Sequence, residues 1–336
     1  RSITVRLRKG INIVRLHNDT ARMPDIDCMT VIPTDRDTRP SIKTDHLTVE
    51  KRKNLLGCDL RVPRFGWQIK SDKNNVRQES YRILVSSTSE KATALEGDVW
   101  DSGTVMSDSS QWVGYKGMPL KPATRYHWRV KVITDQGESP WSAPAMWSTG
   151  IMDPSGHGAI WIGLDSLMDG DSQTRHSRLR ARYLRKEFKA TKPVARATAH
   201  ICGLGFYNLF VNGSRVDDDA LTPAPTDFTR SVIYNTYDVT PLIGDTNAIA
   251  VTLAPGYYYA MAQNHETNVR TTYGFPKMWM RLMLEYADGT SECIVSDESW
   301  RLSADGAIRY SNIYDGEMCD CLLYTSPSPR DVEESR

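Results

Sequence analysis

The feature that most constrains this chain is an alternation of apolar and polar side chains with a period of two residues. Gly, Pro, Asn or Asp bounds most of the alternating segments, among which are SITVRL (2–7), SYRILVSS (80–87), YHWRVKVIT (126–134), NAIAVTLA (247–254) and MWMRLMLEYADG (278–289). A period of two places successive side chains on opposite faces of a strand, and helical spacing with capping residues is nearly absent. The sequence therefore predicts an all-β protein built of tandem β-sandwiches.

Composition argues against two classes of partner. The 336 residues include 42 basic and 41 acidic side chains, and the net charge of +1 provides no field that would attract nucleic acid or an anionic membrane surface. The longest apolar stretch, Ala248–Ala262, contains Thr252, Pro255 and Gly256 and is shorter than the ~18–20 residues of a spanning helix. We therefore expect no nucleic-acid partner and no membrane segment.

Shifts in pattern predict five segments, which are residues 1–36, 37–57, 58–151, 152–318 and 319–336. The first holds too few strands for a sandwich and is predicted to be the truncated end of a domain. The second is polar and charge-rich without a sustained period, which predicts a linker or an entry strand. The third and fourth are each long enough for a complete sandwich. The last is abruptly rich in Ser and Pro, and we interpret it as a tail that is not native.

Two local signals support the sandwich prediction. In LKPATRYHWRV, Tyr126 is placed to form a tyrosine corner by bonding back to the backbone, while Trp128 and Val130 alternate toward a core. In VNGSRV, Asn212-Gly213 predicts a tight β-hairpin.

A series of strings adds a family resemblance. In chain order these are FGWQI, QESYRILVSS, VWDSGTV, LKPATRYHWRVKVITDQGESPWS, WIGLD, LRKEF, GLGFYNLFVNG, LTPAPTDFTRSVIYNTYDVT, NAIAVTLAPGYY and YDGEMCD. Over about residues 58 to 320, this series resembles the N-terminal, non-catalytic region of bacterial α-L-rhamnosidases. One departure is Gly256-Tyr257-Tyr258, where the family usually has Gly-Trp-Tyr.

The resemblance implies a particular domain order. A fibronectin type III-like sandwich would occupy 58–151 and a larger, jelly-roll-like rhamnosidase sandwich 152–318. GINIVRLHNDTARMPDIDCMTV (10–31) resembles the closing strands of a galactose-binding-like carbohydrate module. The family's catalytic (α/α)6 barrel, which lies downstream of this region, has no counterpart in the sequence. The full-length parent is thus expected to hydrolyse terminal α-L-rhamnosides with inversion, while this chain contains none of the catalytic residues.

Sugar binding without catalysis requires an aromatic surface for the apolar face of the sugar and polar groups for its hydroxyls. The candidates near predicted strand ends are Tyr207, Asn208, Asn212, Asp217, Tyr257 and Tyr258. By resemblance the ligand would be an L-rhamnose-containing glycan, and the partner the missing C-terminal catalytic barrel. The alternative for these residues is that they pack the sandwich and its interface with the barrel.

Calcium is the one cofactor for which the sequence offers ligands. Asp217, Asp218 and Asp219 follow the hairpin, and loop carboxylates with carbonyls suit a hard cation. Asp217 and Asp219 are the candidate ligands, and a solvated loop is the alternative interpretation. The resemblance adds Asp27, because galactose-binding-like modules often ligate a structural calcium at that position.

The family implies a secreted or periplasmic protein. An alternative function from a different class is a non-catalytic extracellular protein of tandem β-sandwiches that binds sugars or mediates adhesion. YDGEMCD favours the rhamnosidase interpretation, because in the family it marks the approach to the catalytic region.

Overall fold

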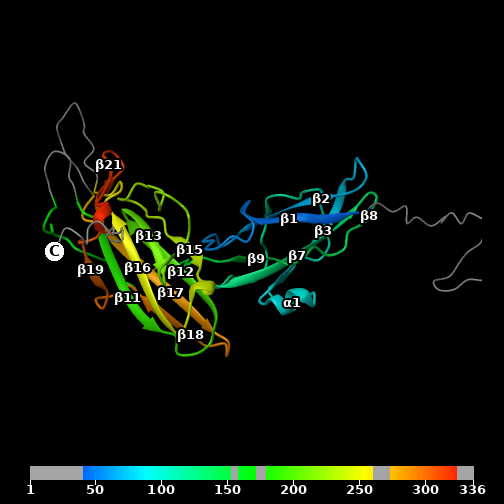
Figure 1. Cartoon of the computed structure of the whole chain (residues 1–336). Coiled ribbons are helices and arrows are strands. Elements are labelled where there is room, and N and C mark those ends of the chain that lie inside the picture. The colour runs from blue at the N-terminus through cyan, green and yellow to red at the C-terminus, as the bar shows by residue number, and fades with distance from the viewer. Residues whose placement is uncertain (1–40, 153–157, 172–178, 260–272, 324–336) are drawn as a thin grey trace, which may run out of the picture. The chain divides into compact units, whose positions relative to one another are not determined.

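The computed structural model describes residues 41–152, 158–171, 179–259 and 273–323, all within one compact unit (Figure 1). Strands dominate these ranges, which confirms the all-β prediction. Helical structure in them is confined to short pieces, namely α1 (Ser89–Thr93), η1 (Thr240–Leu242) and η2 (Cys321–Leu323). The predicted carbohydrate-module remnant at 1–36 and most of the predicted tail lie outside the described residues.

The first sandwich consists of two antiparallel sheets. Its strands are β1 (Lys43–Val49), β2 (Arg64–Lys70), β3 (Gln78–Ser86), β4 (Trp100–Asp101), β5 (Val105–Met106), β6 (Val113–Gly114), β7 (Arg125–Thr134), β8 (Gly137–Glu138) and β9 (Ala145–Ser148). One sheet has the order β1-β2-β6. The other has the order β4-β3-β7-β8, with β5 paired to β3 and β9 paired to β7.

Aromatic rings fill the core between these sheets. The Phe65 ring lies 4.6 Å from Trp128 and 5.4 Å from Trp147, centroid to centroid, and Tyr126 stacks on Trp147 at 5.2 Å. The Lys121 N–H donates to the Tyr126 hydroxyl at 2.8 Å, which confirms the predicted tyrosine corner. Burial of such large rings is the main stabilisation of a sandwich of this size.

Strand β1 lies inside residues 37–57, for which the sequence predicts a linker or an entry strand. It pairs with β2, and Val49 is 1% exposed in the core. The sequence pattern leaves both alternatives open because the register shifts between Asp45 and Thr48, where His46 has a positive φ of 51°. This irregularity breaks the two-residue period from which a strand is recognised.

The second sandwich also has two sheets, and several of its strands are long. Its strands are β10 (Ile162–Gly163), β11 (Arg182–Lys189), β12 (Val194–Leu204), β13 (Phe206–Val211), β14 (Ser214–Arg215), β15 (Asn235–Asp238), β16 (Thr246–Ala254), β17 (Lys277–Tyr286), β18 (Ser291–Val295) and β19 (Arg301–Ser303). One sheet has the order β10-β17-β12-β15, with β18 beside β17, and the other β14-β13-β16-β11-β19. A separate hairpin follows, formed by β20 (Ile308–Asn312) and β21 (Gly316–Cys319).

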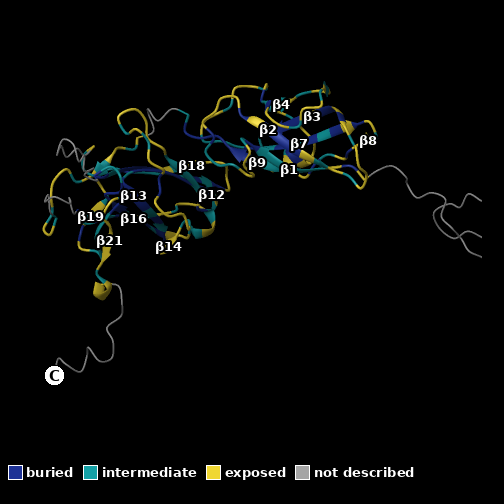
Figure 2. Cartoon of the chain, turned by 90° about the horizontal axis from the view of Figure 1, so that it is seen from above, coloured by how far each residue is buried: buried dark blue, intermediate teal, exposed yellow. Residues whose placement is uncertain are grey.

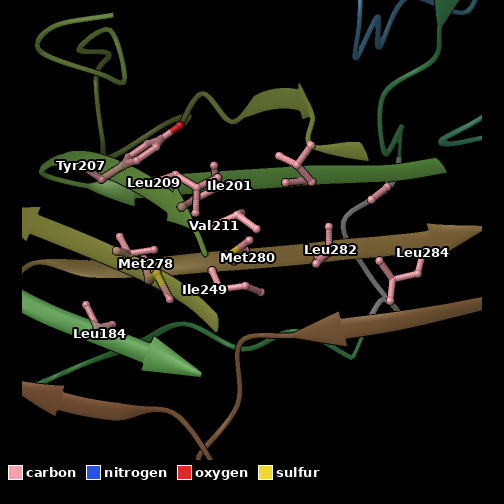
Figure 3. Packing of buried hydrophobic residues seen from close by; sticks show 14 of the residues in the cluster. Leu184, Ile201, Tyr207, Leu209, Val211, Ile249, Met278, Met280, Leu282 and Leu284 are labelled. Carbon is pink, nitrogen blue, oxygen red and sulfur yellow. The ribbon is translucent and has the colours of Figure 1, made fainter. Parts of the chain in front are cut away.

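Aliphatic side chains and methionines fill the core of the second sandwich. Figure 3 shows Ile201, Leu209, Ile249, Met280 and Leu282 projecting between the strands toward one another. Each of the five is at most 2% exposed. Figure 2 shows the strands as largely buried or intermediate, with exposed residues concentrated in the connecting loops.

Strand β12 is buried on both faces. Ala197, Ala199 and Ile201 face the core, whereas Thr198 and His200 line a small cavity together with residues of the first sandwich such as Arg125. The first sandwich therefore covers the outer face of β12.

A tyrosine joins the two sandwiches. The Tyr234 hydroxyl donates to Asp59 Oδ2 at 2.7 Å and accepts the Ile151 N–H at 2.9 Å, while Asp59 Oδ1 accepts the Met152 N–H at 2.9 Å. Gly150 permits this approach, because a Cβ there would lie 2.1 Å from the Tyr234 hydroxyl. The hydroxyl thus links the loop ahead of β15 to two segments of the first sandwich.

A buried ion pair fixes the start of β11 to the preceding segment. Arg182 Nη2 lies 2.6 Å from Asp171 Oδ2, and the two side chains are 1% and 0% exposed. The backbone N–H groups of Met168 and Arg180 donate to the same carboxylate at 2.7 and 2.8 Å. Burial opposes ionisation of Asp171, but these hydrogen bonds outweigh it and hold its pKa below the ordinary value.

The first prediction concerns the tyrosine that joins the sandwiches. Tyr234→Phe should lower the free energy of unfolding by about 1–3 kcal/mol, because it leaves the Ile151 N–H and the Asp59 carboxylate without their shared partner. Urea unfolding of the whole chain measures the change. The control is Tyr314→Phe at a side chain that is 60% exposed, and an equal effect of both variants would contradict the assignment.

The second prediction concerns the buried ion pair. Asp171→Asn should cost about 3–5 kcal/mol at pH 7, because Arg182 would remain buried without its counter-charge. Since the folded pKa of Asp171 is lowered, its contribution is complete above the ordinary carboxyl pKa of about 4 and is lost as the pH falls below it. Urea midpoints of the two proteins should therefore converge in acid.

Asp305→Asn is the matched control for this pair. Asp305 is 88% exposed and lies 3.8 Å from Arg180, so its removal should leave the midpoint nearly unchanged. A gap between wild type and Asp171→Asn that persists undiminished at pH 3 would refute the linkage.

Candidate functional site

The residues predicted to bind sugar do not converge on one site. The structure divides them among the edge of the second core, the β13–β14 hairpin with its strand, and an aromatic group beyond the end of β16. Each place has different chemistry.

Tyr207 and Asp217 lie at the edge of the core. Tyr207 is 4% exposed, and its hydroxyl lies 3.4 Å from that of Tyr237, which also accepts an Asn235 Nδ2–H at 3.0 Å. Burial, together with nearby Asp217, raises the pKa of Tyr237 to about 12. The Tyr207 ring packs against the core and therefore presents no free face on which a sugar could stack.

Asn212 closes the hairpin that the sequence predicts. It adopts a φ of +51° and Gly213 one of +81°, as a tight turn of this kind requires. Its Nδ2 donates to Leu242 O at 2.8 Å and to Asn247 Oδ1 at 2.9 Å, and its Oδ1 accepts the Ala248 N–H at 2.8 Å. These hydrogen bonds commit the side-chain amide of Asn212 to stabilising the fold. Asn208 lies on the opposite face of β13 from Tyr207 and is half-buried.

Tyr257 and Tyr258 belong to a group of rings that we call the aromatic group, made of Phe206, Phe228, Tyr257, Tyr258, Tyr273 and Tyr314. Tyr258 stacks on Tyr273 with centroids 5.8 Å apart, and Phe228 meets both rings edge-on at 5.3 and 5.2 Å. Tyr257 contacts Phe206 and Tyr314 at 5.9 and 6.3 Å. Tyr273 and Tyr314 remain 51% and 60% exposed. Solvent-exposed rings of this kind are suited to the apolar face of a sugar.

Charged side chains accompany the aromatic group. Lys277 Nζ lies 2.8 Å from Asp165 Oδ2, and both charges act on Tyr258, whose pKa is raised chiefly by burial. A carboxylate and an ammonium group beside rings are the polar complement that sugar hydroxyls need. Asp165, Tyr273 and Tyr314 cannot be predicted from the sequence as site residues, because nothing in the local pattern connects residues so far apart in the chain.

The candidate calcium ligands do not form a recognisable cation site. The described ranges contain no cluster of three or more His, Cys, Asp or Glu side chains that could hold a metal. Asp217 Oδ1 accepts the Asp219 N–H at 3.1 Å and lies 3.8 Å from Arg215 Nη2, so a cationic side chain already faces it. The structure thus brings no third carboxylate, His or Cys to Asp217 and Asp219, Asp27 lies outside the described residues, and calcium binding stays a prediction.

No Asp or Glu of the described ranges has a pKa raised above its ordinary value. Wherever the pKa of an Asp or Glu departs from its ordinary value, the shift is downward, which keeps the group ionised. Asp98 is typical: burial opposes ionisation, but hydrogen bonds from Lys91 and Ser87 prevail and lower its pKa to about 2. A glycosidase acid needs the opposite shift, so that it still carries a proton near neutral pH.

None of the helices described in the structure is long and apolar enough to span a membrane.

Two family models match the chain. Residues 44–153 match the Rha78A-like N-terminal immunoglobulin domain, and residues 192–326 match the α-L-rhamnosidase N-terminal domain. The first match assigns the first sandwich to an immunoglobulin-like domain. It begins within β1 and so includes this strand in the domain.

Similar proteins are α-L-rhamnosidases. One from Formosa agariphila is 34% identical over 303 residues, which cover 83% of this chain and 31% of the relative. The solved structure of the α-L-rhamnosidase from Dictyoglumus thermophilum is 33% identical, with a TM-score of 0.74 over 84% of this chain and 32% of that one. That of Streptomyces avermitilis α-L-rhamnosidase complexed with L-rhamnose is 25% identical, with a TM-score of 0.74 over 85% of this chain and 43% of that one.

The chain thus spans about a third of the length of the curated relatives. Both of its sandwiches match domains that the family places at its N-terminus, and the arrangement of strands agrees with the solved relatives. Residues 44–153 and 192–326 of the chain therefore belong to the N-terminal domains of the α-L-rhamnosidase family.

Proposed function

We propose that this chain is the non-catalytic front of an enzyme that hydrolyses terminal α-L-rhamnosides, and that by itself it does not cleave them. The observation that carries the proposal is the state of its carboxylates. Those with shifted pKa values are held ionised by hydrogen bonds and cationic partners, so none of them is suited to protonate a leaving group. The relatives, which are about three times as long, have ample further sequence for a catalytic region.

In this proposal the chain acts through contact with a catalytic region of the same protein. An inverting glycosidase uses two carboxyl groups about 6.5–9.5 Å apart on opposite sides of the scissile bond. The β-sandwiches would support the region that contributes this pair and would present glycan to it.

The third prediction tests the absence of catalysis. The purified 336-residue chain should release no nitrophenol from p-nitrophenyl α-L-rhamnopyranoside above the uncatalysed blank, while the full-length Formosa agariphila relative serves as positive control. Hydrolysis that co-purifies with the chain and disappears in Asp217→Asn or Asp165→Asn would contradict the proposal.

A second function is favoured by one further observation, the exposure of the aromatic group. We propose that L-rhamnose binds at Phe228, Tyr258 and Tyr273, with Asp165 and Lys277 as partners for its hydroxyls. The apolar methyl of a 6-deoxy sugar suits a corner in which one ring meets two others edge-on. A stand-alone sugar-binding protein would need the same site, so binding alone does not separate these two functions.

The fourth prediction concerns this binding. Calorimetry should give a dissociation constant between about 1 μM and 1 mM for L-rhamnose, or −8.2 to −4.1 kcal/mol. Tyr273→Ala should weaken it, because an exposed ring is lost, whereas Tyr314→Ala in the neighbouring ring pair should not. Parallel titrations with calcium and with a chelator test the calcium hypothesis. No measurable heat of binding, either with calcium or with the chelator, would contradict the proposal.

A further inference from the structure

A groove outside the aromatic group lies along the edge of the second sandwich. It has a volume of about 220 Å³ and is lined by Arg185, Lys186, Glu187, Ser299 and Arg301. It opens because β19 pairs with β11 only from Tyr183 to Arg185, while β11 continues to Lys189. The volume is below the range of about 300–1,000 Å³ typical of drug-sized ligands, so the groove suits one small charged molecule such as a single sugar unit.

Two like charges meet at the mouth of this groove. Arg185 and Arg301 are direct partners across the antiparallel β11–β19 pair, and both are exposed. Directly opposed side chains of an antiparallel pair have Cβ atoms about 4.5–5.5 Å apart, and like charges there are destabilising. An anion bound between the two guanidinium groups would relieve the repulsion.

The acidic side chains nearby are committed to other cations. Glu187 pairs with Arg185, and Asp297 Oδ2 lies 2.8 Å from Lys186 Nζ. Within the described ranges Arg301 has no carboxylate within ion-pair distance, and Glu298, at the turn ahead of β19, does not line the groove. One positive charge is therefore uncompensated.

The pair between Arg185 and Glu187 can also rearrange. Its side chains are 57% and 67% exposed, and an exposed ion pair contributes at most about 1 kcal/mol. Arg185 can therefore turn toward a ligand at little cost, and Glu187 would then be free to accept a hydrogen bond from a hydroxyl group of the ligand.

We propose that this groove binds the carboxylate of an acidic sugar, a hexuronate. Arg301 and Arg185 grip the carboxylate, because guanidinium groups match it with paired N–H donors. Glu187 and Ser299 contact the sugar hydroxyls. The choice of a sugar as the carrier of the carboxylate rests on the proposed function, whereas the anion site itself rests on the arginines alone.

Ligand-observed NMR titration of the whole chain tests the site with sodium glucuronate as the probe. Glucose is the neutral match and acetate the carboxylate without a sugar. Glucuronate should bind more tightly than either, and added NaCl should weaken it by screening. Arg301→Gln should raise the dissociation constant about tenfold, since a charge-assisted contact is lost. Arg301→Lys should fall between Arg301→Gln and wild type.

Arg52→Gln is the matched control, because Arg52 is an exposed arginine of the first sandwich and should leave glucuronate binding unchanged. An unchanged urea midpoint in Arg301→Gln ensures that the loss is not unfolding. Equal affinities for glucuronate and acetate would overturn the sugar assignment, and no binding, or binding unaffected by Arg301→Gln, would overturn the site. None of these outcomes affects the proposed function, which is judged by hydrolysis of a neutral rhamnoside.

Discussion

The register between β12 and β17 is the constraint on which the second sandwich depends. The two strands pair in one continuous register from Arg196 opposite Glu285 to Leu204 opposite Lys277, and a bulge separates this stretch from the pair of Val194 with Tyr286. Because side chains alternate between faces, this one register brings the inward residues of both strands to the same layer. A slip by one residue would move Met280 and Leu282 out of the core and place charged Arg281 within it.

The same register explains how the two sandwiches are connected. Strand β12 carries Ala199 and Ile201 on its core face and the polar Arg196, Thr198 and His200 on the other. Thr198 and His200 are nevertheless buried, because they line a small cavity together with residues of the first sandwich. Polar contacts such as Tyr234 to Asp59 and Arg125 to Asp238 at 2.7 Å then surround this covered face. The packing of β12 therefore depends on the first sandwich as well as on the core of the second.

Local patterns in the sequence were sufficient to predict most strands, the Asn212-Gly213 hairpin and the tyrosine corner, since each depends on a few neighbouring residues. They were insufficient where tertiary structure decides. In FYNLFV both faces of β13 carry an aromatic residue, so alternation does not reveal that Tyr207 faces the core. The aromatic group is harder still, because Phe228 comes from the β14–β15 connection and Tyr258 and Tyr273 from opposite ends of the β16–β17 connection, and the sheets create their proximity.

The two proposed binding places are separate enough to act independently. Arg185 lies opposite Ala250 on β16, four residues before the strand ends at Ala254, and the aromatic group begins beyond that end. At about 3.3 Å per residue, the groove and the rings are at least ~13 Å apart along the strand. Substitutions at this separation without shared partners have additive effects. A glycan that engaged both places would lose affinity by the product of the two single effects, whereas two unrelated ligands would each respond to one substitution. The strand geometry therefore allows the two single substitutions and their combination to distinguish one ligand from two.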